Sequence, residues 1–191
     1  PTLSSAASDV YKRQLQSQLE SFSLDAEDMV IRRVRIEEEN VEFHHTGGKV
    51  HISLPRSIGW YDTIDVRLDY SANPKLGTFF FKPDKTYPDQ PWQAWTQGEE
   101  EDNHHWVPLY DFPNDRSTFE TILTVDQKFK AVSNGELVSL KKNKNGTHTW
   151  HWKENFPMVA YLISFVVGEY EKVEDSYNCL LYTSPSPRDP H

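Results

Sequence analysis

The chain has 191 residues, of which 37% are hydrophobic, 26% charged and 13% aromatic, a globular composition with enough length to bury a core in about one domain. With 20 Lys and Arg against 29 Asp and Glu, the net charge is −9. This excludes a general nucleic-acid binder or a binder of anionic membranes, because both need a basic face. The longest apolar run, residues 158–168, is too short for a membrane-spanning helix of roughly 20 residues.

The two ends of the chain differ in character from the interior. Residues 1–14 show no periodicity that would join them to a core, and residues 179–191 form a Ser- and Pro-rich string that begins with the single cysteine, Cys179. Both strings resemble translated sequencing-adapter DNA, although a pair of natural disordered tails is the alternative. We therefore expect non-native segments at residues 1–14 and 179–191, and a partial native domain over residues 15–178.

The interior is predicted to consist mainly of β-strands, because hydrophobic and polar residues alternate in most of it. Residues 15–29 are the exception, since Leu15, Leu19 and Phe22 have the spacing of a helix. Strands are then expected, in chain order, at residues 33–37, 41–44, 50–54, 64–70, 78–81, 119–125, 131–132, 137–140, 149–152 and 158–167. The pattern predicts an all-β, sandwich-like domain.

Turn residues and a long apolar run refine this prediction. Gly47-Gly48 and Asn145-Gly146 stand between pairs of predicted strands, which is typical of β-hairpins. The run at residues 158–167 is almost continuously β-branched and aromatic, so we expect one strand that is buried on both faces. These features predict two hairpins and one central strand.

One segment, residues 84–115, lacks a clear strand pattern, and long ordered loops of this kind are usually functional. In an extended chain Gln97 and Glu99 would project from the same side. Gly98 between them would let a ligand approach the backbone. A carboxylate beside an amide oxygen suits the binding of a protonated amine. The alternative is a solvated acidic loop.

Four sequence blocks occur in the order found in one known family. They are residues 96–99 (TQGE), 106–120 (WVPLYDFPNDRSTFE), 133–137 (SNGEL) and 161–170 (YLISFVVGEY). Together they resemble the N-terminal β-domain of M1 zinc aminopeptidases, the aminopeptidase N family, and residues 24–31 are similar to early strands of that domain. The resemblance covers about residues 24–170. Leu109 departs from the pattern, because many members carry a cysteine there.

The resemblance implies a saddle-like β-sandwich domain, incomplete at its N-terminus, that packs on a thermolysin-like catalytic domain. It implies that Gln97 helps to form the pocket for the first residue of a peptide substrate, and that Glu99 contacts the free amino terminus of that peptide. Glu100, Glu101 and Asp102 are expected to be solvated. Zinc would belong to the full-length parent protein, whereas this chain is expected to hold no metal and no catalytic residue.

Two motifs of the family are absent from this sequence: His-Glu-x-x-His, which binds zinc, and Gly-x-Met-Glu-Asn, which holds the substrate amine. We therefore expect no peptidase activity from these 191 residues alone. Adjacent residues on a strand point to opposite faces, so His44-His45 and His104-His105 are poor chelating pairs. His104-His105, beside Glu101 and Asp102, is the best of these weak metal candidates.

The main prediction is thus a fragment of a zinc aminopeptidase that removes N-terminal residues from peptides. Two alternatives from other classes stay open. One is a catalytically silent relative that keeps the β-domain for protein interactions. The other is a carbohydrate-binding β-sandwich module, suggested by the candidate exposed residues Trp92 and Trp95.

Overall fold

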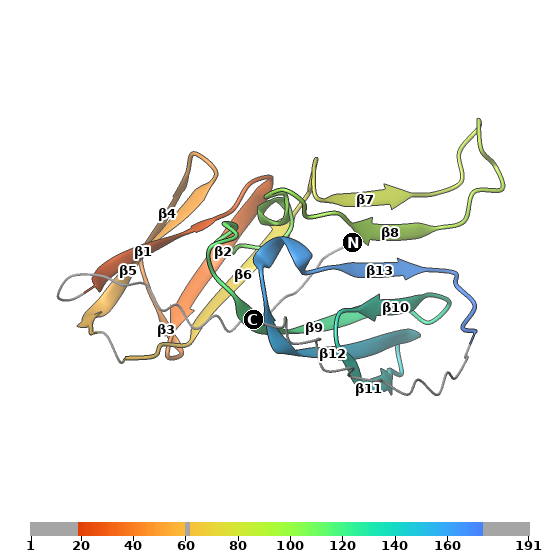
Figure 1. Ribbon diagram of the computed structural model, residues 1–191. Coiled ribbons are helices and arrows are strands. Elements are labelled where there is room, and N and C mark those ends of the chain that lie inside the picture. Colours follow the sequence, from red (N-terminus) through yellow and green to blue (C-terminus); the bar gives the residue numbers. More distant parts are fainter. Residues whose placement is uncertain (1–18, 60–61, 174–191) are drawn as a thin grey trace, which may run out of the picture.

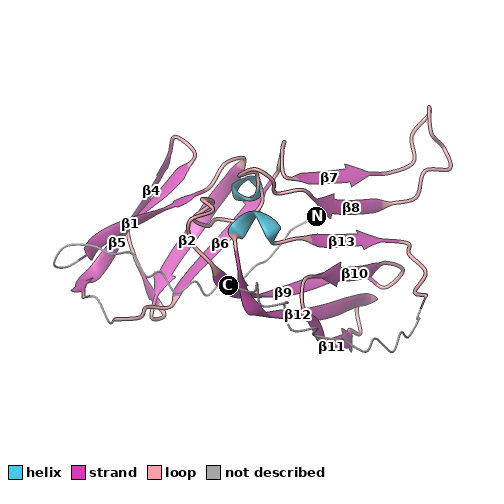
Figure 2. Ribbon diagram, in the orientation of Figure 1, coloured by secondary structure: helices cyan, strands magenta, loops and turns pink. Residues whose placement is uncertain are grey.

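A computed structural model describes residues 19–59 and 62–173, so the segments 1–14 and 179–191 lie outside the described residues. The described part contains thirteen β-strands and two 3-10 helices of three residues each (Figures 1 and 2). The predicted all-β class is therefore confirmed. Within the described ranges, no helix has the length and apolar character needed to cross a membrane.

The first six strands form one lobe of the molecule (Figure 1). They are β1 (Leu19–Asp25), β2 (Met29–Ile36), β3 (Glu39–Asn40), β4 (Phe43–Thr46), β5 (Lys49–Ile58) and β6 (Val66–Ala72). They make two three-stranded antiparallel sheets with strand orders β1-β5-β4 and β3-β2-β6. We call this part the first lobe.

The remaining strands form the second lobe beside it (Figure 1). They are β7 (Thr78–Phe81), β8 (Gln93–Thr96), β9 (Ser117–Asp126), β10 (Lys130–Ser133), β11 (Glu136–Lys142), β12 (Thr147–Met158) and β13 (Phe165–Gly168). Their sheets have the orders β10-β13-β8-β7 and β11-β12-β9. The 3-10 helices η1 (Asn103–His105) and η2 (Ala160–Leu162) belong to the loops of this lobe.

Each lobe has its own hydrophobic core, because strand alternation sends every second side chain inward. The first core consists of Leu24, Ala26, Met29, Ile31, Val34, Ile36, Val50, Ile52, Leu68 and Tyr70. The second consists of Trp106, Val107, Leu109, Leu123, Ala131 and Phe165. In the second core the rings of Trp106 and Phe165 meet edge to face, with 5.2 Å between their centroids.

The segment after η1 joins the two lobes through main-chain hydrogen bonds. The amide of Asp25 donates to the carbonyl of Leu109 at 2.7 Å, and the amide of Leu109 donates back at 3.1 Å. The hydroxyl of Tyr70 donates to the carbonyl of Trp106 at 3.1 Å. The two cores are therefore connected by residues that lie just downstream of the candidate site.

Both predicted hairpins are present. β4 and β5 are joined by Gly47 and Gly48, whose φ angles of 58° and 71° lie in the left-handed region that glycine adopts readily. β11 and β12 pair as expected, with Leu140 opposite Trp150. These connections were predictable because the turn chemistry is local.

Three other expectations were wrong. The helix expected within residues 15–29 is in its described part strand β1, which pairs with β5 and buries Leu24 opposite Val50. The segment 84–115 contains strand β8. The run 158–167 is not one strand, since β12 ends at Met158 and η2 intervenes before β13. In each case pairing with a distant strand or turn overrides the local pattern.

Candidate functional site

Strand β8 carries the candidate residues at its C-terminal end, where it is fixed against β13. Thr96, the last residue of β8, is buried, and its Oγ1 accepts a hydrogen bond from the amide of Phe165 at 2.9 Å. The next amide, that of Gln97, donates to the carbonyl of Gly77 at 3.0 Å. The backbone is thus held on both sides at the point where the candidate segment begins.

Gln97 and Glu99 are both exposed and lie on either side of buried Gly98. The strand stops at Thr96 and a turn begins at Glu99, so the two side chains do not lie on one continuous extended strand. The peptide bond between Glu99 and Glu100 is cis. Both predicted binding residues are therefore accessible; Gln97 directly follows the strand, and Glu99 begins the turn.

Gly98 is required by a close protein contact and not by an open space for a ligand, which corrects the expectation from sequence. A Cβ atom at Gly98 would lie 2.6 Å from Cγ and Nδ2 of Asn103, a distance that real Cβ atoms do not tolerate. Asn103 is itself 0% exposed. The amide of Asp102 donates to the carbonyl of Gly98 at 3.0 Å and closes the turn.

The two histidines that follow bind different carboxylates. Nδ1 of His104 lies 2.9 Å from Oδ2 of Asp111, and Nδ1 of His105 lies 2.8 Å from Oδ2 of Asp28. The hydrogen bond with Asp111 raises the pKa of His104 and outweighs the opposing effect of burial. The contact between His105 and Asp28 ties the turn to the first lobe.

Zinc does not fit the residues of this chain that the structure describes. Within residues 19–59 and 62–173, no group of three or more His, Cys, Asp and Glu side chains could hold a metal ion. The ring centroids of His104 and His105 are 4.5 Å apart, but each ring is bonded to its own carboxylate as described above. No chemical step is therefore assigned to zinc on this domain.

The outer face of the sheet β10-β13-β8-β7 carries a row of hydrophobic side chains, which we call the apolar row. Its members lie opposite one another across the four strands, and directly opposed residues face the same side of a sheet. The row consists of Val132, Val166, Trp95 and Phe79. The rings of Phe79 and Trp95 are 4.6 Å apart between centroids, and Phe81 stacks on Trp95 at 5.9 Å.

The other sheets bear polar groups on their outer faces. On β11-β12-β9, Lys153 pairs with Glu120 at 2.9 Å, and the hydroxyls of Thr124 and Thr149 are 2.8 Å apart. The sheets of the first lobe carry the Arg33–Asp69 ion pair and the Ser23–His51 hydrogen bond. Exposed hydrophobic side chains occur on these sheets too, such as Val30, Ile122 and Val138. The directly opposed pairs named above are nevertheless polar, unlike the pairs of the apolar row.

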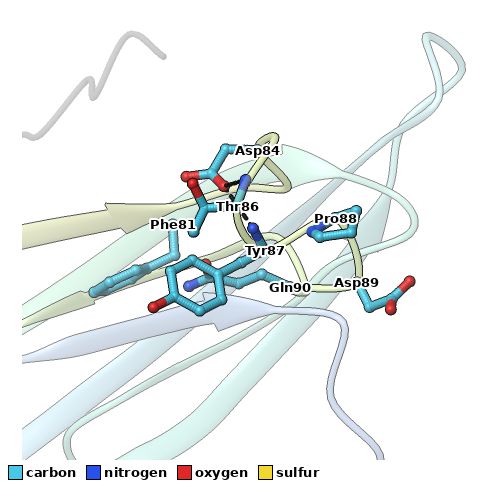
Figure 3. Close-up of a pocket in the computed structure, with 7 residues that line it drawn as sticks. All are labelled: Phe81, Asp84, Thr86, Tyr87, Pro88, Asp89 and Gln90. Atoms are coloured by element: carbon cyan, nitrogen blue, oxygen red, sulfur yellow. Dashed lines mark hydrogen bonds between the residues drawn. The ribbon is translucent and has the colours of Figure 1, made fainter.

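A shallow hollow lies at the opposite end of β8 from Gln97. Residues of the β7–β8 loop line it: Phe81, Asp84, Thr86, Tyr87, Pro88, Asp89 and Gln90 (Figure 3). Oδ1 of Asp84 accepts hydrogen bonds from the amides of Thr86 and Tyr87 at 2.7 Å each, which shapes the loop. The hollow and the candidate residues are therefore separate features.

The tryptophans that suggested carbohydrate binding are in contact with other side chains. Trp95 is half-buried among Phe79 and Phe81. Trp92 is exposed, but Nζ of Lys128 lies 5.6 Å from the centroid of its ring. The structure thus gives no specific support to the carbohydrate-binding alternative.

Sequence reasoning missed two features of this region. Asn103 reads as one more polar residue in an acidic loop, and no sequence signal marks it as buried. The one sequence signal for the apolar row is the run of three phenylalanines at residues 79–81 in β7, which does not alternate and so does not indicate which side chains share a face. Its opposition to Trp95 and Val166 depends on strand order, which the sequence did not supply.

Most of the chain matches the model of one known domain family. Residues 6–162 match the peptidase M1 N-terminal domain family. The chain therefore belongs to that family.

Relatives and solved structures agree with this assignment. Aminopeptidase B of Mus musculus is 22% identical over 143 residues, which are 75% of this chain and 21% of that protein. Transcription initiation factor TFIID subunit 2 of Gallus gallus is 26% identical over 133 residues, 68% of this chain and 11% of that protein. The chain thus spans about one fifth or less of these relatives.

A crystal structure of an M1 zinc metallopeptidase from Deinococcus radiodurans has the same fold. It aligns with a TM-score of 0.70 and 23% identity, over 80% of this chain and 35% of that one. A mutant of that enzyme bound to a Tyr-Ser-Ala substrate aligns with a TM-score of 0.69. At this level of identity the comparison shows the shared fold.

Proposed function

We propose that this chain is the N-terminal domain of a zinc aminopeptidase and contributes to the pocket for the amino terminus of a peptide substrate. The observation that carries the proposal is the exposed pair Gln97 and Glu99, held at the end of β8 in a chain of the M1 N-terminal family. Zinc and the catalytic residues would belong to another part of the parent protein. This domain itself breaks no bond.

The chemistry of the pair suits a protonated amine. The side-chain oxygen of Gln97 and the carboxylate of Glu99 are hydrogen-bond acceptors, and the ammonium group of a peptide has three donors. Hydrogen bonds to charged groups are each worth about 1.5–3 kcal/mol. The buried anchors Thr96 and Gly98 supply the fixed backbone that such a contact needs.

The partner of the domain would be the catalytic part of the same parent protein. The support for this is the apolar row, because the other three sheets of the described chain bear ion pairs and polar hydrogen bonds on their outer faces. A contiguous exposed apolar surface is typical of an interaction site. The relatives are several times longer than this chain, so they possess further domains that can cover such a face.

A kinetic comparison tests the role of the pair. In the full-length parent, Gln97→Ala and Glu99→Ala are each expected to weaken transition-state binding of peptides with a free amino terminus by about 1–3 kcal/mol. This loss would be measured as a lower kcat/KM. Glu101→Ala is the matched control, since Glu101 is exposed in the same acidic turn, and it should leave kcat/KM unchanged. Unchanged kcat/KM in both test variants would refute the binding role.

A catalytically silent interaction domain is the second candidate. Its support is the similarity to TFIID subunit 2 of Gallus gallus, whose name describes a transcription factor. The two candidates differ in one measurement on the full-length parent. Release of N-terminal amino acids from peptides supports the aminopeptidase, whereas stable protein binding without any hydrolysis supports the silent relative.

A further inference from the structure

The turn that presents Gln97 and Glu99 rests on one fully buried side chain, that of Asn103. We infer that Asn103 is the positioning residue of this site: it fixes the segment 97–99 in the geometry that receives the substrate amine. The functional part of this inference depends on the proposed role of Gln97 and Glu99. The structural part does not.

The amide of Asn103 uses its acceptor and both of its donors. Oδ1 accepts a hydrogen bond from Nε1 of Trp106 at 2.9 Å. Nδ2 donates to the carbonyl of Ala160 at 2.7 Å and to the carbonyl of Ile163 at 3.0 Å. Since an asparagine amide has two donor hydrogens, the side chain is satisfied and has one orientation. It links η1 to the turn η2, which lies nearby in Figure 2.

This oriented side chain lies directly against Gly98. The space that a Cβ at Gly98 would need is filled by Cγ, Oδ1 and Nδ2 of Asn103. On the upstream side, Thr96 is bonded to the backbone of Phe165. The backbone between Gln97 and Glu99 is therefore packed against the fixed side chain of Asn103, and it directly follows the fixed residue Thr96.

Buried polar side chains concentrate around this segment. In the described residues they are Thr78, Thr96, Asn103 and Asp111. Thr78 lies opposite Thr96 in the sheet, and Asp111 bonds to the backbone and ring of His104 beside Asn103. The hydrogen bonds of Thr96 and Asn103 favour one arrangement of the segment, whereas Oγ1 of Thr78 and Oδ1 of Asp111 have no hydrogen-bond partner within the described residues.

The consequence for binding is geometric. Displacement of a binding group by about 1 Å can cost on the order of 100-fold in rate. If Asn103 acts by positioning Gln97 and Glu99, then Asn103→Ala should lower kcat/KM. In that variant, Glu99→Ala should reduce kcat/KM by a smaller factor than it does in the wild type. A purely structural contribution would instead leave the two effects additive.

Hydrogen exchange on the 191-residue chain tests the structural part. In Asn103→Ala, the amides of Asp102 and Gln97 should exchange at least roughly 10-fold faster, while the amide of Ile52 in the first core should be unchanged. Asn134→Ala is the matched control, because Asn134 also bonds to the η2 region, at Leu162 and Ser164, without packing on Gly98. Equal exchange of Asp102 in both variants would overturn the inference.

A second variant covers the case in which Asn103→Ala does not fold. Gly98→Ala probes the same contact from the other side, and it should accelerate exchange at the same two amides. In the full-length parent, the double variant Asn103→Ala/Glu99→Ala should lose at least about threefold less kcat/KM than the product of the two single losses. Additive effects would overturn the positioning role. If Gln97→Ala and Glu99→Ala leave kcat/KM unchanged while exchange responds as expected, the proposed function fails and the structural part stands.

Discussion

Replacing one valine of the apolar row by lysine should have different effects in the isolated domain and in the full-length parent. Val132 lies on β10 and is 47% exposed. Complete burial of a valine side chain is worth about 1.5–3 kcal/mol, so covering the exposed half would contribute roughly 1 kcal/mol. A lysine at this position would lose the free energy of burying the valine side chain, and it would place an unpaired ammonium group in an apolar contact. The total cost of Val132→Lys in the parent is then about 2 kcal/mol or more.

The assay is urea unfolding of both proteins with a matched control. Ile122 is 52% exposed on the polar outer face of β11-β12-β9, so Ile122→Lys provides the same change on a face that no partner should cover. In the 191-residue chain both variants should change the free energy of unfolding by no more than about 0.5 kcal/mol. In the parent only Val132→Lys should be destabilising. Equal effects of the two variants in the parent would refute the assignment of the apolar row as the covered face.

Two predictions concern stability and pH. Ile52 is fully buried in the first core, so Ile52→Ala should lower the free energy of unfolding of the chain by about 2–5 kcal/mol in urea denaturation; a loss below that found for Ile122→Ala would show that this core is not packed as described. The pKa of His104 is raised above its ordinary value of 6.5 by its hydrogen bond with Asp111, so the folded state holds this proton more tightly. The stabilisation is complete at pH values below 6.5 and is lost as the pH rises through the folded pKa. The Tm of the wild type should therefore fall more than that of His104→Gln over this rise, and parallel Tm profiles would contradict the prediction.

Local features of the sequence were sufficient for most of the fold. The hairpin turns at Gly47-Gly48 and Asn145-Gly146 were predictable because glycine supplies the positive φ angles that such turns need. Alternation located most strands, because successive side chains of a strand point to opposite faces of a sheet. The helix expected within residues 15–29 was wrong because helical spacing is coincidental there, whereas pairing of β1 with β5 buries Leu24.

The candidate site was predictable only in part. Exposure of Gln97 and Glu99 agrees with the expectation of an accessible pair in an acidic loop. The reason for Gly98 was not predictable, since it depends on Asn103. The position of Asn103 depends in turn on the carbonyls of Ala160 and Ile163, which lie far along the chain. Contacts over such a separation leave no trace in local pattern.

The central claim is that this domain belongs to a zinc aminopeptidase. The most direct test is to sequence the source DNA downstream of the codon for Asn178. The account predicts a reading frame that encodes Gly-x-Met-Glu-Asn followed by His-Glu-x-x-His. A continuing reading frame with neither motif would contradict it.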